Sequence, residues 1–75
     1  MDTPTYRVAH PIQLGLVLAR IRAEAGLSQQ QMADRIRVQR TYVARMENGL
    51  QTQQLRRIFR VLHEAGYELV IRRRG

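Results

Sequence analysis

The chain has 75 residues, below the roughly 100 to 200 of an average domain, so there is room for one small domain and not for several. Hydrophobic residues make up 44% and charged residues 25%, a globular composition that excludes a disordered polar segment. Thirteen Arg, no Lys and six acidic residues give a net charge of +7, which leaves two interpretations, simple solubility or a nucleic-acid partner gripped by guanidinium groups.

The residue pattern of the N-terminal part predicts an extended arm followed by a helix. Residues 1–10 show no helical period, so we expect a flexible arm, and Pro11 suits the first turn of a helix. An apolar stripe at helical spacing follows and ends at Gly26. The stripe consists of Leu14, Val17, Leu18, Ile21 and Ala25. A second apolar patch on the opposite face, suited to receive a partner or the arm, consists of Ile12, Gly15, Leu16 and Ala19.

Three more helices are expected before residue 66. Ser28 is suited to cap a helix over residues 29–36, and a third helix follows a short turn and covers residues 39–47. Thr52 is suited to cap a fourth helix, which Gly66 ends. The expected buried positions are Met32, Ala33 and Ile36 in the second helix, Val43 and Met46 in the third, and Leu55, Ile58, Phe59 and Leu62 in the fourth.

Residues 67–71 alternate in hydropathy and are rich in β-branched and aromatic types, which predicts a β-strand. A lone strand leaves its backbone groups unpaired, and residues 6–9 are the other strand candidate. Pairing with the same strand of a second subunit would satisfy both edges, so we expect a homodimer; a fifth short helix or a frayed tail is the alternative. The expected dimerisation residues are Tyr67, Leu69, Val70 and Ile71.

Residues 29–47 have the layout of a helix-turn-helix, two short helices about a tight turn. On a helical wheel one exposed face of the third helix combines Arg40, Thr41, Ala44 and Arg45. Such a helix fits the major groove of DNA, where Arg binds guanine O6 and N7, so we expect these residues to contact bases. The alternative is a solvated helix face without a partner.

Phosphate contacts are expected around the same two helices, because helix N-termini and polar side chains bind phosphate oxygens. The candidates are Ser28, Gln29, Gln39 and Tyr42. Two of these positions have a purely structural alternative. Tyr42 is also suited to packing against the first helix, and Gln29 to a role in the helix cap alone.

Several short motifs in order resemble the Cro/C1-type (Xre) helix-turn-helix family over about residues 14–62. They are Gly26-Leu27-Ser28-Gln29, Met32-Ala33, Arg40-Thr41-Tyr42-Val43 and Glu47-Asn48-Gly49. The resemblance implies an all-α, lambda-repressor-like bundle of four helices, here with a C-terminal β-strand that pairs across a dimer, and a structural ion pair between Arg22 and Glu47. Two positions depart from the family pattern: Arg37 replaces a usual Gly at a turn that often needs positive φ, and Gln39 replaces a Ser or Thr cap.

Within that family the chain resembles HipB-like antitoxins, through its arm, the run Pro11-Ile12-Gln13-Leu14 and the C-terminal strand. This implies a cytoplasmic repressor that binds a pseudo-palindromic operator of a HipBA-like toxin-antitoxin operon, with a HipA-type kinase toxin as partner. Two alternatives stay open: a protein-interaction module that mainly neutralises the kinase, or a stand-alone Xre-type regulator without a toxin. We expect a flexible arm at 1–10, a DNA-binding domain at 11–66, and a dimerisation strand with a basic tail at 67–75.

Other function classes find little support in the residues. The chain has no Cys, and His10 and His63 have no partners at triad or metal spacing, so we expect no catalysis, no cofactor and no metal. The longest apolar-rich stretch, residues 14–19, is far shorter than the roughly 20 residues that span a bilayer, so we expect no membrane segment. RNA is a distant third partner because aromatic residues for stacking are few.

Overall fold

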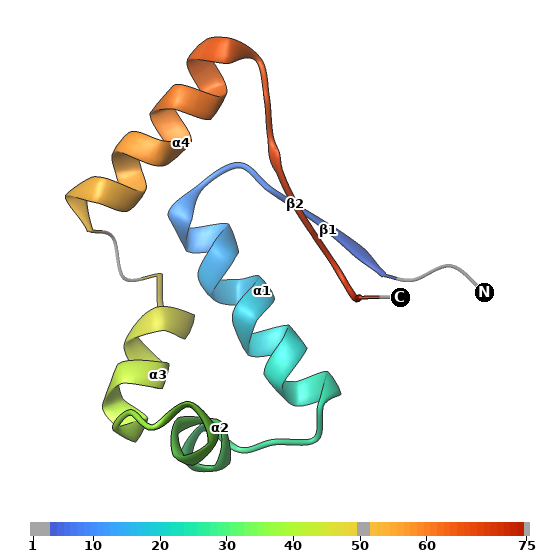
Figure 1. Cartoon of the computed structure of the whole chain (residues 1–75), viewed down its shortest axis with the longest axis vertical. Coiled ribbons are helices and arrows are strands. Elements are labelled where there is room, and N and C mark those ends of the chain that lie inside the picture. The colour runs from blue at the N-terminus through green and yellow to red at the C-terminus, as the bar shows by residue number, and fades with distance from the viewer. Residues whose placement is uncertain (1–3, 50–51, 75) are drawn as a thin grey trace.

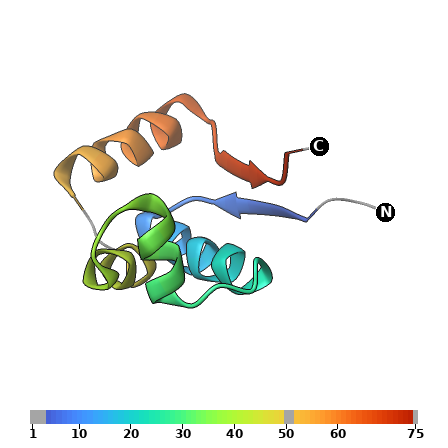
Figure 2. The ribbon, with the colours of Figure 1, turned by 60° about the horizontal axis from the view of Figure 1, so that its bottom comes forward.

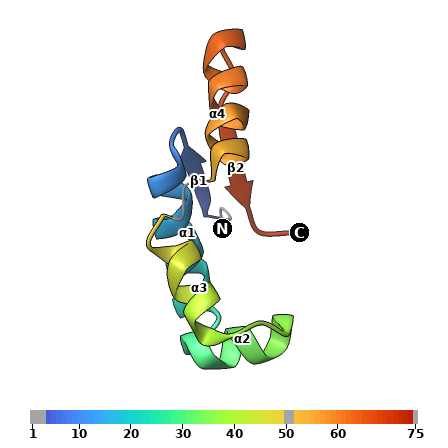
Figure 3. The same ribbon diagram turned by 90° about the vertical axis from the view of Figure 1, so that its left-hand side faces the viewer.

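The computed structural model describes residues 4–49 and 52–74 (Figure 1). The elements in chain order are β1 (Thr5–Val8), α1 (Pro11–Glu24), α2 (Gln29–Ile36), α3 (Arg40–Glu47), α4 (Gln53–Ala65) and β2 (Leu69–Arg72). The predicted four-helix architecture with a C-terminal strand is therefore confirmed. The molecule is thin, with extents of 37 × 36 × 16 Å, and α4 lies at the opposite end from α2 (Figure 3).

Helices α2 and α4 begin where a side chain satisfies one of their first free N–H groups. Ser28 and Gln31 form a reciprocal capping box: the Ser28 hydroxyl accepts from the Gln31 N–H at 3.0 Å, and the Gln31 amide oxygen accepts from the Ser28 N–H at 2.8 Å. The Thr52 hydroxyl accepts from the Leu55 N–H at 3.1 Å and begins α4. Both predicted caps are confirmed.

Helix α1 is the central element of the fold, because it contacts α3, β1 and α4 (Figure 1). The buried side chains of the core come from four different elements, namely Val8, Ala33, Val43 and Phe59. Two positions predicted to be buried are instead about half exposed, Ile36 at 48% and Ile58 at 49%. The physical reason for Ile58 is that α4 contacts α1 over a short stretch only and otherwise runs away from it (Figure 1), so part of its apolar stripe faces outward.

The C-terminal strand has its partner within the chain. β1 and β2 lie side by side as an antiparallel pair (Figure 2). In this pair Thr5 lies opposite Arg72, and Val8 lies opposite Leu69. An ion pair at 2.9 Å between Arg7 and Glu68 joins the same two segments.

This pairing corrects the expectation of a flexible arm for residues 5–8, and it corrects the strand boundaries, since β2 begins at Leu69 rather than Tyr67. The expected cross-dimer pairing assumed a lone strand, but one edge of β2 is already paired with β1. Pairing across a dimer stays a prediction, and it would have to use the other edge.

Candidate nucleic-acid interface

A tight turn at Arg37 joins helices α2 and α3. Arg37 ends α2 in the left-handed region, with φ 61° and ψ 49°, as expected for a position that usually carries Gly. The Val38 N–H donates to the Ala33 carbonyl at 3.0 Å and completes the turn. Ala33 has no exposed surface, because its small side chain lets the two helices approach closely. A non-glycine residue in this conformation costs about 1 kcal/mol or more.

The C-terminal end of α3 lies directly on α1 at Gly15. A methyl group added at this residue would lie 2.7 Å from the carbonyl oxygens of Met46 and Glu47 and from the backbone nitrogen of Gly49. This contact corrects the expectation of an open patch around Gly15, since the end of α3 occupies part of that face. Ile12 and Leu16, at 55% and 64% exposure, remain accessible.

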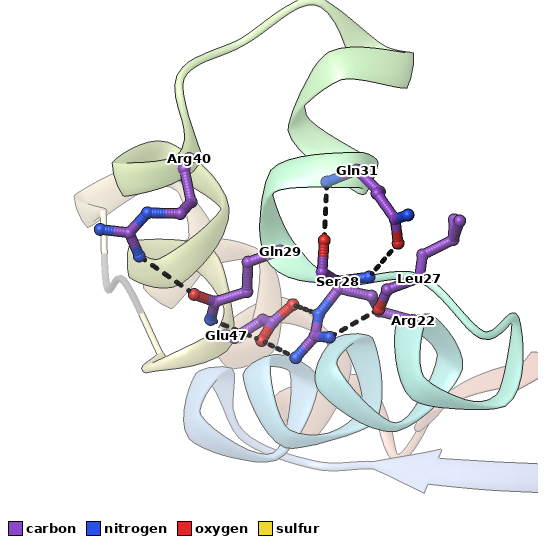
Figure 4. Close-up of polar contacts among 7 residues, drawn as sticks. All are labelled: Arg22, Leu27, Ser28, Gln29, Gln31, Arg40 and Glu47. Carbon is purple, nitrogen blue, oxygen red and sulfur yellow. Dashed lines mark hydrogen bonds and ion pairs between the residues drawn. The ribbon is translucent and has the colours of Figure 1, made fainter.

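An ion pair links the same two helices, the one that the family resemblance implies. Arg22 Nε lies 2.6 Å from Glu47 Oε2, and Arg22 Nη2 lies 2.9 Å from Glu47 Oε1 (Figure 4). Arg22 Nη1 also donates to the Leu27 carbonyl at 2.8 Å. The Glu47 side chain is only 8% exposed, and hydrogen bonding from Arg22 is the main reason that its pKa lies below the ordinary value. The pair therefore ties the end of α3 to α1.

Gln29 extends this network to the start of α3. Its Nε2 donates to Glu47 Oε1 at 3.1 Å, and its Oε1 accepts from Arg40 Nη1 at 3.3 Å (Figure 4). Gln29, which is predicted to contact phosphate, is thus hydrogen-bonded to Arg40, which is predicted to contact bases. An amide carries two N–H donors and a guanidinium five, so both side chains retain donors for a ligand.

The predicted contact residues of α3 lie around its outer side. Arg40, Thr41 and Arg45 are exposed, whereas Ala44 is half-buried. Tyr42 is 48% exposed, and Gln39, also exposed, makes no side-chain cap for the helix. A hollow of about 220 Å³ is lined by Val38 and four predicted contact residues, Gln39, Thr41, Tyr42 and Arg45. Arg40 lies on the Gln29 side instead.

Two roles are predicted for Ser28, a helix cap and a phosphate contact, and the structure shows the cap. Ser28 is exposed, but its hydroxyl and its N–H are both engaged in the capping box. A phosphate at this helix end would therefore meet the remaining N–H groups of the first turn.

The residues predicted for dimerisation present apolar surface to solvent. Tyr67, Leu69 and Val70 are 70%, 36% and 46% exposed, and Ile71 is half-buried. Val61 of α4, at 66% exposure, adds to the accessible apolar surface of the C-terminal region.

Within residues 4–49 and 52–74, no three His, Asp or Glu side chains lie close enough together to hold a metal ion. No helix in that same part of the chain is long and apolar enough to cross a membrane.

Comparison with known families gives one match. The sequence model described as a helix-turn-helix domain matches residues 13–66, which is most of the chain. Comparisons with curated proteins and with solved structures found no match.

Proposed function

This chain belongs to the helix-turn-helix domain family, and we propose that it is a sequence-specific transcriptional repressor that binds double-stranded DNA as a homodimer. One observation carries the proposal: the inner side of α3 is fixed to α1 and α2, while Arg40, Thr41 and Arg45 project outward. A helix held in this way presents its side chains to the major groove at a defined angle, as base readout requires.

The proposed contacts are of two chemical kinds, contacts with base edges and contacts with phosphate oxygens. Arg40 and Arg45 read guanine O6 and N7 with paired N–H donors, and Thr41 and Ala44 contact thymine methyl groups or pack closely against bases. Tyr42, Gln39, Gln29 and the N-terminus of α2 around Ser28 hold phosphate oxygens and set the register of α3 in the groove. Gln29 serves both tasks, because its contact with Arg40 orients that guanidinium.

The exposed apolar surface of the C-terminal region supports the proposed homodimer. Leu69 and Val70 of β2 remain accessible in one chain, and β2 has one edge that β1 does not pair. A two-fold axis through this region places two copies of α3 in successive major grooves about 34 to 36 Å apart on a pseudo-palindromic operator. Occupation of an operator near a promoter blocks polymerase.

The experiment is a selection of duplexes from a random pool by the purified protein, followed by affinity measurements on the enriched sequence. We expect Arg40→Ala and Arg45→Ala each to lose about 1 to 3 kcal/mol, roughly 5- to 150-fold, at particular base pairs. Arg35→Ala, on the exposed side of α2, is the control with the same change in charge. Failure to enrich any sequence, or full affinity of both α3 variants, would contradict the proposal.

We further propose that the regulator is the antitoxin of a HipBA-like operon and binds a HipA-type kinase toxin. The support is the resemblance in the run that starts α1, where Gln13 also accepts the Ala9 N–H at 2.7 Å, and in β2. Co-purification with the product of an adjacent gene tests this role. Operator binding without such a partner would instead favour the stand-alone Xre-type regulator, and toxin capture without operator binding would favour the protein-interaction module.

A further inference from the structure

A cavity of about 660 Å³ lies between α4 and the start of α1, and none of its lining residues belongs to α2 or α3. Its basic and polar lining consists of His10, Gln53, Arg56, Arg57, Arg60 and His63. No Asp or Glu lines the cavity. The volume is in the range of roughly 300 to 1,000 Å³ that small-molecule sites occupy.

Within residues 4–49 and 52–74, the three Arg side chains of this cavity have no anionic partner. In the described part of the chain Arg7, Arg20 and Arg22 each bind a carboxylate. Among the same residues, the guanidinium groups of the cavity make neither a hydrogen bond nor an ion pair; they are Arg56, Arg57 and Arg60. Like charges three or four residues apart on a helix repel one another, so these side chains gain from an anion between them.

The residues at the start of α1 add to the positive electrostatic potential of the cavity. His10, Pro11 and Ile12 line it, so the N-terminus of α1 faces the same space as the Arg side chains. No side chain caps this helix, and its first N–H groups and dipole favour an anion. The His10 and His63 rings meet edge to face at 5.4 Å and connect the start of α1 to the end of α4.

We infer that this cavity binds a phosphate group, held by the Arg56 and Arg60 guanidiniums with N–H donors from His10 and His63. Guanidinium pairs with phosphate through two parallel hydrogen bonds, and that geometry suits the neighbouring oxygens of a phosphate monoester or diester better than a single chloride ion. The phosphate belongs either to a phosphorylated small molecule or to a DNA backbone that runs past α4. The inference does not depend on the proposed operator binding, because free phosphate reports on it separately.

The first arm of the test titrates inorganic phosphate against chloride at equal ionic strength. The readouts are the melting temperature and the NMR signals of the His10 and His63 rings. We expect saturable changes with phosphate alone, and a loss of about tenfold or more in phosphate affinity for the double variant Arg56→Ala/Arg60→Ala. The control Arg35→Ala/Arg74→Ala removes the same charge at exposed positions outside the cavity and should stay within about twofold.

The second arm measures binding to a random-sequence duplex as a function of salt. If the phosphate is part of DNA, the two guanidiniums together neutralise one phosphate in each bound chain, so the double variant lowers the slope of log affinity against log salt by about one per chain relative to the control. A saturable phosphate response with an unchanged slope identifies a free ligand. If phosphate produces no saturable change and the slope equals that of the control, the inference is wrong. Both α4 substitutions raise helix propensity, and circular dichroism of the variants verifies that they fold.

Discussion

The replacement of Gly15 by Ala tests the contact that sets the angle of α3. A methyl group at residue 15 would meet three backbone atoms of the α3 C-terminus at 2.7 Å, closer than nonbonded carbon contacts allow. Backbone atoms cannot rotate away as a side chain does. The end of α3, from Met46 to Gly49, would therefore have to move off α1.

Two opposing contributions decide whether Gly15→Ala raises or lowers the free energy of unfolding. Ala in place of Gly inside a helix favours the folded state by about 1 kcal/mol through backbone entropy. Overpacking of a closed contact costs typically about 1 to 3 kcal/mol, and three immobile neighbours point to the upper end. We expect a net loss of about 1 to 2 kcal/mol, which lowers Tm by roughly 5 to 15 °C in a domain of this size.

Thermal and urea unfolding followed by circular dichroism measure this difference. Ala23→Gly is the matched control, because Ala23 is exposed in the same helix and reports the propensity change alone, with the opposite sign. If Gly15→Ala stabilises the protein by as much as Ala23→Gly destabilises it, no clash exists and the inferred packing of α3 on α1 is refuted.

Two further predictions concern Glu47 and Arg37. Since hydrogen bonding from Arg22 holds the pKa of Glu47 below its ordinary value of 4.5, the stabilisation by this carboxylate is complete above that pH and is lost as the pH falls through the lowered value. The stability difference between the native protein and Glu47→Gln should therefore shrink in acid unfolding series below that pH, and a constant difference would contradict it; Glu64→Gln is the exposed control. Arg37→Gly should raise the free energy of unfolding by about 1 kcal/mol by relieving the left-handed conformation, whereas Arg35→Gly inside α2 should lower it by a similar amount. Equal signs for the two glycine variants would show that φ at residue 37 is unstrained.

Local features of this fold could be predicted from the sequence, because each depends on neighbours within one helical turn. The caps at Ser28 and Thr52 and the positive φ at Arg37 are of this kind. Contacts between distant segments could not be predicted in the same way. Val8 pairs with Leu69 across most of the chain, and only tertiary packing brings the two strands together.

The same difference between local features and contacts of distant segments holds for the candidate site. The outward position of Arg45 follows from helical spacing alone, but the contact between Gln29 and Arg40 depends on the angle of the corner between α2 and α3. The sequence places Gly15 on an apolar face of the first helix. It does not predict that the C-terminal end of α3 lies on this residue. The exposure of Ile58 likewise depends on how many neighbours α4 has.

The most direct test of the central claim, that α3 enters the major groove with its Arg side chains toward the bases, is a binding cycle with modified DNA. Each guanine of the selected duplex is replaced in turn by 7-deazaguanine, which lacks the N7 acceptor, and affinity is measured for the native protein and for Arg45→Ala. We predict that the native protein loses about fivefold or more, from the roughly 1 kcal/mol of a hydrogen bond, at each of the two guanines per half-site that Arg40 and Arg45 read. Arg45→Ala should lose nothing further at one of these two guanines. Equal losses for both proteins at every guanine would contradict the assignment of Arg45, and no loss for the native protein at any guanine would contradict the major-groove account itself.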